Sequence, residues 1–111
     1  MAAKKRAVLV ANKSYGLYIG ETTATDADLQ ETRGEDGTMA LTVTDCRHVA
    51  RWFGKKGGIT SLAMFGPCGT RVKESLVGAA CPSSLLSGVV NVFELSKEAV
   101  AAFAAIEASG S

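Results

Sequence analysis

The residues VVNVFELSKEAVAAF, numbers 89–103, contain the clearest strand of the chain, followed at once by its clearest helix start. Three valines among residues 89–95 favour a strand, because β-branched side chains pack well on a pleated surface. Ser96 stands where a helix N-cap is expected, and Glu98 lies in the first turn, where the helix dipole favours an acid. The pattern predicts a strand over 89–95 and a helix over about 97–108.

The predicted C-terminal helix carries an apolar stripe that suits packing on a sheet. Leu95 and Val100 occupy the two positions of a hydrophobic staple, which sets the angle at which the chain enters the helix. Phe103 and Ile106 follow Val100 at helical spacing. We therefore expect Val100, Phe103 and Ile106 to face a sheet, with the helix covering one opening of it.

The first half of the chain predicts further strands. Residues 7–11 are continuously apolar, which is typical of a strand buried on both faces. Residues 15–22 follow a polar turn, and Gly16 and Gly20 within them indicate bulges or a close backbone approach. Residues 39–44 alternate apolar and polar side chains, the pattern of a half-buried strand. We expect residues 15–22 to pair with both of these neighbours.

The remaining segments are less decided. Residues 23–38 are polar and acidic and predict a long mobile loop, and the small residues of 78–87 predict a second loop. Residues 46–53 fit either a helix or a strand, and residues 59–65 fit either a strand or a helical turn. Residues 71–77 fit an amphipathic strand.

Length and composition limit the class of protein. The 111 residues, 47% apolar and 21% charged, suit a single domain over residues 1–111. The longest apolar run, 99–106, is far shorter than the ~20 residues of a bilayer-spanning helix. The apolar run 7–11 is too short for the core of a secretory signal. We expect an α+β fold: a small bent antiparallel sheet or open barrel of about five strands with a C-terminal helix.

The formal net charge of +1 conceals an ordered pattern of charges. Residues 1–20 carry four cations and no acid, and residues 21–45 carry seven acids and one arginine. Residues 46–73 then carry six cations and no acid, while residues 74–111 carry four acids and one lysine. Segregated charge creates local potentials that matter for encounter and orientation. It is equally consistent with two solvated faces of a small domain.

No catalytic or metal-binding signature is present. Cys46, Cys68 and Cys81 are too far apart for a C-x-x-C zinc motif, and His48 is the single histidine. Cys46 and His48 suit a nucleophile and base only weakly, because they share a face only in an extended segment. The cysteines are more simply small apolar residues. We expect a protein that is not an enzyme and that needs no metal or cofactor.

A basic and aromatic segment is the best candidate for a binding site. Arginine forks hold phosphates in a bidentate manner and aromatic faces stack on bases, so the combination suits a nucleotide or a single strand. A lone tryptophan equally suits core or subunit packing. The candidate ligand or partner residues are Arg47, Arg51, Trp52, Lys55, Lys56 and Arg71.

A string of short matches over roughly residues 7–105 resembles a family of small phage and prophage proteins that is catalogued only as a domain of unknown function. The resemblance implies a phage or prophage origin and a small accessory role, and it implies no activity. The matching residues are Tyr15-Gly16-Leu17-Tyr18-Ile19-Gly20, Leu41, Asp45, Arg47, Trp52, Gly58-Ile59, Leu62-Ala63, Gly66-Pro67, Arg71, Val89 to Glu94, Ser96, Glu98, Ala99 and Phe103.

Two functions follow as hypotheses. The first is a phage or prophage accessory protein, not an enzyme, that self-associates and acts by binding or assembly. In it the acidic block of one copy meets the basic block of the next and closes a ring. The alternative is an anion-binding protein that captures a nucleotide or nucleic acid of the host through the basic and aromatic segment. Either protein is expected in the host cytoplasm or in the virion, not secreted through a signal peptide, and without a membrane partner.

Overall fold

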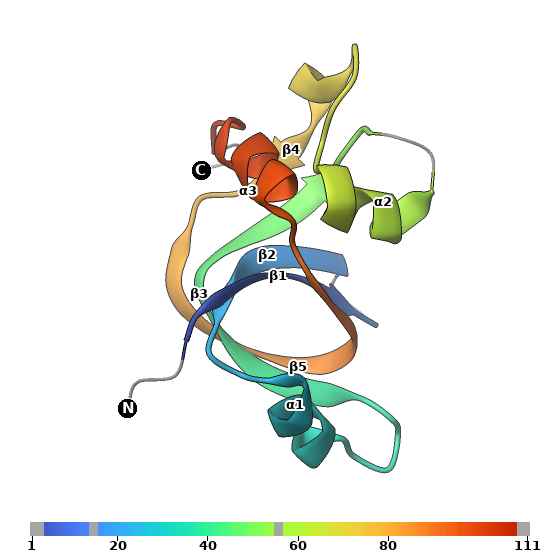
Figure 1. Cartoon of the computed structure of the whole chain (residues 1–111), viewed down its shortest axis with the longest axis vertical. Coiled ribbons are helices and arrows are strands. Elements are labelled where there is room, and N and C mark those ends of the chain that lie inside the picture. The colour runs from blue at the N-terminus through green and yellow to red at the C-terminus, as the bar shows by residue number, and fades with distance from the viewer. Residues whose placement is uncertain (1–3, 14–15, 55–56, 109–111) are drawn as a thin grey trace.

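The computed structural model describes residues 4–13, 16–54 and 57–108. They form an antiparallel sheet that closes into a small barrel, with helices packed around it (Figure 1), which confirms the predicted α+β class. The elements in chain order are β1 (Arg6–Asn12), β2 (Gly16–Thr22), α1 (Asp26–Thr32), β3 (Met39–Arg51), α2 (Gly58–Phe65), the 3-10 turn η1 (Val72–Glu74), β4 (Leu76–Val77), β5 (Cys81–Glu94) and α3 (Lys97–Ala104).

Two long, bent strands close the barrel. The strand order is β2-β1-β5-β3-β4, and an additional pairing of β2 with β3 completes the ring. The first half of β5 pairs with β3, from Cys46↔Cys81 to Met39↔Val89. Its second half pairs with β1, from Val89 to Glu94. The two halves of β5 therefore have different neighbours, which matters for the candidate site below.

Strand β1 separates two apolar clusters. Val8, Leu9 and Val10 are all 0% exposed, which confirms the predicted strand buried on both faces. Val8 and Val10 belong to the cluster inside the barrel, which also contains residues of β3 and β5. Leu9 points to the opposite face and joins an outer cluster with residues of α2 and α3. This alternation follows from the period of two along a strand.

A bulge in β3 reverses which of its alternate side chains face the inner cluster and which face the outer one. The φ angle of Asp45 is 51°, which lies in the left-handed region. One type of β-bulge has its first residue in this conformation. The register shifts there, with Ile19 opposite Arg47 but Glu21 opposite Thr44. Gly20 faces the bulge, and a Cβ at this position would lie 2.7 Å from the carbonyl oxygen of Thr44. The close approach predicted at Gly20 is therefore confirmed.

The acidic segment 23–38 contains the helix α1, where a loop was predicted. Thr25 is its N-cap: Asp28 N–H donates to Thr25 Oγ1 (3.1 Å), and Thr25 N–H donates to a carboxylate oxygen of Asp28 (2.8 Å). Hydrogen bonding from the backbone N–H of Thr25, and then from its side chain, lowers the pKa of the Asp28 carboxyl. Leu29 is buried in the cluster inside the barrel. A buried leucine and a capping box thus help to dock this short polar helix.

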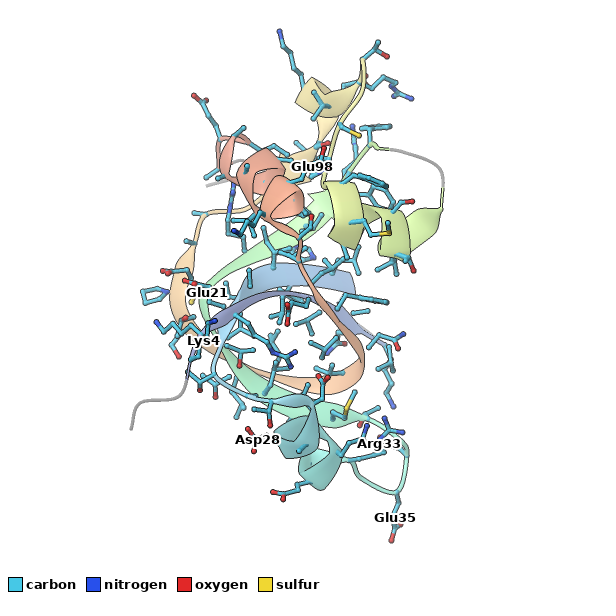
Figure 2. The ribbon with its side chains drawn as sticks, in the orientation of Figure 1. Lys4, Glu21, Asp28, Arg33, Glu35 and Glu98 are labelled. Carbon is cyan, nitrogen blue, oxygen red and sulfur yellow. The ribbon has the colours of Figure 1, made fainter. Side chains whose placement is uncertain are left out.

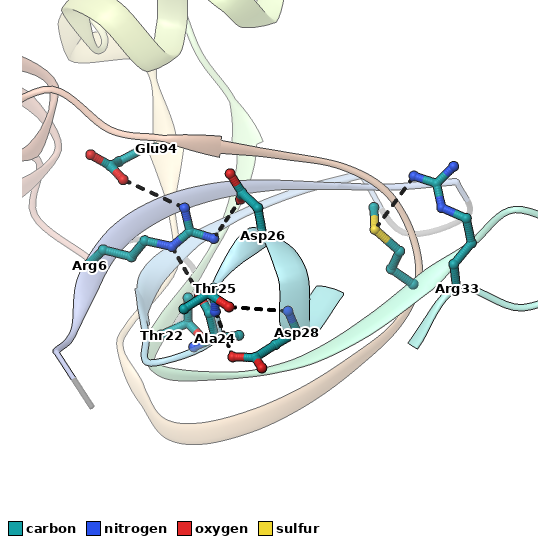
Figure 3. A network of polar contacts seen from close by, with 9 residues as sticks. Arg6, Thr22, Ala24, Thr25, Asp26, Asp28, Arg33 and Glu94 are labelled. Atoms are coloured by element: carbon teal, nitrogen blue, oxygen red, sulfur yellow. Dashed lines mark hydrogen bonds and ion pairs between the residues drawn. The ribbon is translucent and has the colours of Figure 1, made fainter. Parts of the chain in front are cut away.

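Arg6 fixes the start of α1 to the barrel (Figure 3). Its Nε donates to Ala24 O (3.0 Å), and its Nη2 donates to Asp26 Oδ1 (3.0 Å). The third contact is an ion pair of Nη1 with Glu94 Oε1 at 3.6 Å. These contacts connect β1 with α1 and with the end of β5. The side chain of Arg6 is mostly shielded from solvent.

The C-terminal helix begins at Lys97 as predicted but ends at Ala104, earlier than the predicted 108. Phe103 is 2% exposed, whereas Val100 is 42% exposed, so the expectation that Val100 faces the sheet was wrong. Ala99 is buried in its place. Because Phe103 packs with Leu9 in the outer cluster, α3 covers the outside of the sheet rather than an opening of the barrel.

The undecided segments take these forms. Strand β3 continues to Arg51, so residues 46–51 are strand rather than helix. Residues 58–65 form the helix α2. The segment 71–77 is mostly not a strand, because η1 occupies 72–74 and the strand β4 is limited to 76–77. Residues 81–87, predicted as a loop, are the first part of β5.

Candidate functional site

Arg47 lies on the outer face of β3, just after the bulge, and acts as a clamp for backbone carbonyls. Its guanidinium donates to Gly78 O (2.7 Å), Ile106 O (2.8 Å), Phe103 O (3.0 Å) and Val77 O (3.4 Å). Burial lowers the pKa of Arg47. The carbonyls of residues 103 and 106 belong to the end of α3, where a helix leaves acceptors unpaired. The structure thus gives this predicted ligand residue a structural role.

The other described candidates lie near the end of β3 and in the segment before β4. Trp52 packs against the outer cluster, which agrees with the packing alternative for this residue. Arg71 stacks over the ring of Phe53, with Cζ 4.1 Å from the ring centroid. Arg51 is exposed and close enough to Glu74 to help lower the pKa of that carboxyl. Lys55 and Lys56 lie outside the described residues.

The charge of Arg71 is largely occupied within the chain. Its Nε and Nη2 donate to the two carboxylate oxygens of Glu74 at 2.7 and 3.0 Å, a bidentate pair. This pair raises the pKa of Arg71 and is the main cause of the lowered pKa of Glu74. Arg47 and Arg71 thus spend most of their donors within the described part of the chain, which leaves few for an anion.

Cys46 and His48 lie two residues apart in the extended strand β3, which places both side chains on one face. Cys46 is buried inside the barrel, and this burial raises the pKa of its thiol, whereas a nucleophile needs a lowered one. His48 is exposed and lies against Tyr18, with 5.0 Å between the ring centroids. Cys81 is the cross-strand neighbour of Cys46, and both are free thiols. Within residues 4–13, 16–54 and 57–108, no three His, Cys, Asp or Glu side chains are grouped to hold a metal ion.

The first half of β5 has an open edge, a feature that the sequence interpretation missed. From Cys81 to Leu86 this strand pairs with β3 on one side. Its other side extends past the end of β1, where Lys13 N–H donates to Gly88 O (3.0 Å) and the side chain of Asn12 donates to Ser87 O. No described strand pairs with residues 81–86 on that side. In Figure 1 this part of β5 runs along the outer left of the barrel. Leu85, near the end of this segment, is 75% exposed.

The open edge also lacks charge. Residues 75–93 contain no Asp, Glu, Lys or Arg. Proteins usually protect an exposed edge strand with charged side chains, proline, bulges or a covering segment, because its free N–H and C=O groups otherwise pair with another chain. Among residues 81–86, Pro82 is the one such feature. This uncharged edge is therefore suited to pairing.

Opposite charges gather at opposite ends of the molecule. The helix α1, with the exposed acids Asp28 and Glu35 in and after it, lies at one end of the long axis (Figures 1 and 2). The segment that contains Arg71 and Lys73 lies at the other end, beyond α2 and α3. Only parts of the two charge blocks are separated in this way, along a longest extent of 41 Å, because Glu21 and Asp45 of the acidic block lie beside Arg47 of the basic block.

These features define a small antiparallel β-barrel with outer helices and one unprotected strand edge. No described helix has the length and apolar character needed to cross a membrane. The chain belongs to the family described as Domain of unknown function (DUF6948), whose model matches residues 5–103. No curated protein and no solved structure matches the chain.

Proposed function

We propose that this protein is not an enzyme and that it self-associates through the open edge of β5, acting by binding or assembly. The partner is a second copy of the chain, whose β5 pairs antiparallel with the first across a twofold axis. The observation that carries the proposal is the uncharged, unpaired edge from Cys81 to Leu86. The accessory role in a phage or prophage that the resemblance implies is part of the same proposal.

The absence of charged residues at this edge favours a second copy of the chain as the partner. In a twofold antiparallel pair, each edge residue lies opposite a residue of the same strand, so a charged edge would place like charges together. Residues 75–93 avoid this because they carry no charge. Leu85, exposed in one copy, gains apolar cross-strand neighbours in the pair. The main-chain hydrogen bonds of the added strand supply affinity, as in β-augmentation.

The anion-binding alternative has less support. Arg47 donates to four backbone carbonyls and Arg71 to Glu74, which leaves these two guanidinium groups few donors for a phosphate. Trp52 packs against the outer cluster rather than standing clear of it as a stacking platform. We therefore do not place the binding activity in this segment.

Sedimentation equilibrium tests the proposal on the full chain, with Leu85→Lys as the disrupting variant. We expect wild type at twice the mass of one chain and Leu85→Lys at the mass of one chain. Each copy would then bring a lysine to the paired edges, where its charge would lose water. Met64→Lys is the matched control, because Met64 is a 51% exposed apolar residue on α2, away from the edge, and it should remain dimeric.

Salt separates edge pairing from contact between the charged ends. Raising ionic strength from about 0.05 to 0.5 M screens exposed ion pairs strongly but leaves apolar burial and backbone hydrogen bonds in place. The edge-paired dimer should keep its mass under both conditions. A wild-type chain that is monomeric at both salt concentrations, or a Leu85→Lys variant that stays dimeric, refutes the proposal. Dissociation by salt alone would also refute it and would favour contact between the acidic and basic ends.

A further inference from the structure

A second surface, separate from the β5 edge, has the features of a binding site. It is a cleft of about 280 Å³ between α3 and the bulge in β3. Apolar side chains form most of it, among them Ile19, Leu95 and Phe103. Glu21 and Asp45 also line it, and the partly exposed Val100 belongs to the same lining. The cleft is therefore mainly apolar, with two acidic residues among those that border it.

The two carboxylates are available for a ligand. Asp45 is exposed and Glu21 is half-buried. Neither forms an ion pair with another described residue. The bulge brings them to the cleft, because the register shift places Glu21 opposite Thr44 and leaves Asp45 in the extra position.

Arg47 also borders the cleft, and its charge has to be considered. Its guanidinium donates to the carbonyls of residues 103 and 106 at the end of α3, the negative end of a helix dipole. Its positive charge is therefore partly balanced before any ligand arrives. Against this one cation stand two carboxylates, so the cleft favours a cation over an anion.

Size and chemistry together indicate the ligand. Pockets for drug-sized molecules usually measure ~300–1,000 Å³, and this cleft lies just below that range at about 280 Å³. A lysine or arginine side chain has a long apolar stem and a charged head, which suits an apolar floor beside carboxylates. We propose that the cleft between α3 and the bulge of β3 binds a single lysine or arginine side chain of a protein partner.

The test uses n-butylguanidinium, which has the stem and head of an arginine side chain, in a titration followed by ¹H–¹⁵N correlation spectra of the full chain. We expect saturable shifts of the amides of Gly20, Ala80 and Ala104, which line the cleft, with a Kd of about 1–10 mM for so small a ligand. The neutral analogue n-butylurea should bind about tenfold more weakly, because it lacks the charge.

Charge variants assign the effect to these carboxylates. The double variant Glu21→Gln, Asp45→Asn should lose about tenfold in affinity for n-butylguanidinium. It should keep the fold, because asparagine tolerates the left-handed backbone at position 45. Glu98→Gln removes an exposed acid of α3 that does not line the cleft, and it should leave the affinity unchanged. Figure 2 shows Glu98 on α3 and Glu21 on the barrel.

A peptide distinguishes a protein partner from a free small cation. Gly-Leu-Arg-Leu-Gly should bind more tightly than n-butylguanidinium, because its leucines reach apolar surface such as Val100 beside the cleft. Equal or weaker binding of the peptide would overturn the assignment to a protein partner. Equal binding of n-butylurea, or an unchanged affinity in the double variant, would overturn the cation site. These readouts are local to the cleft, so they are independent of whether the chain self-associates through β5.

Discussion

Replacing Arg47 by alanine separates its structural role from a role in ligand binding. The substitution removes a charged donor from four backbone carbonyls, three of them at 3.0 Å or less. Each hydrogen bond from a charged group contributes about 1.5–3 kcal/mol, but the four are not additive, and water can reach some of the released carbonyls. We expect the free energy of unfolding to fall by about 3 kcal/mol, with Tm lower by about 10–20 °C.

The loss has a defined location. The four carbonyls belong to the β4–β5 connection and to the end of α3. Without the guanidinium, the last turn of α3 loses its cationic cap, and the carbonyl of Phe103 keeps only backbone donors such as the N–H of Ile106. Arg47→Lys keeps the charge but not the planar fork of donors, so it should recover less than half of the loss.

Urea denaturation followed by circular dichroism measures the effect, at one fixed protein concentration so that any self-association contributes equally. Arg51→Ala is the matched control, because Arg51 is an exposed arginine on the same strand. It should change the free energy of unfolding by less than about 0.5 kcal/mol. If Arg47→Ala is as stable as Arg51→Ala, the clamp described here is wrong. An anion site would predict that equality, since removing one of several like charges does not destabilise the free protein.

Three further predictions concern other parts of the fold. Gly20→Ala should destabilise the protein by about 1–3 kcal/mol in urea denaturation, because the added Cβ meets Val43 Cγ1 and a backbone oxygen. Phe103→Ala should cost about 3–5 kcal/mol, whereas Val100→Ala should cost less than about 0.5 kcal/mol, and equal losses would contradict the orientation of α3. The pKa of Asp28 is lowered by its cap bonds, so they stabilise α1 above the ordinary pKa of a free aspartate and are lost as pH falls through the lowered pKa. Thr25→Ala removes the hydroxyl but keeps the backbone N–H, which is the larger cause, so it should raise the pKa of Asp28 only partway towards that of a free aspartate in a carboxyl-detected NMR titration. An Asp28 pKa in the wild type that is not lowered would count against the capping box.

Several features were predictable because their causes are local. Residues 7–11 are apolar at every position, and the structure buries β1 on both faces. Ser96 begins α3, and its hydroxyl accepts from Ala99 N–H (3.0 Å) as an N-cap should. The helix α1 had a local signal as well, since Thr25 and Asp28 have capping-box spacing with Leu29 next to them. Because residues 23–38 are mostly polar and acidic, the segment was nevertheless predicted as a loop.

The candidate site depended on contacts between distant parts of the chain. Arg47 belongs to a run of cations in the sequence, yet its partners are carbonyls of residues 77, 78, 103 and 106. Residues 81–87 have a composition typical of a loop, but they form a strand because they pair with β3.

The sequence by itself determined the α+β class, the strand buried on both faces and the start of the last helix, because periodicity and capping act over a few residues. Only the tertiary structure decided the length of β5, which of its edges stays open and the face on which Arg47 lies. Strand pairing joins residues far apart in sequence, and a single bulge at Asp45 moves every later side chain of β3 to the other face.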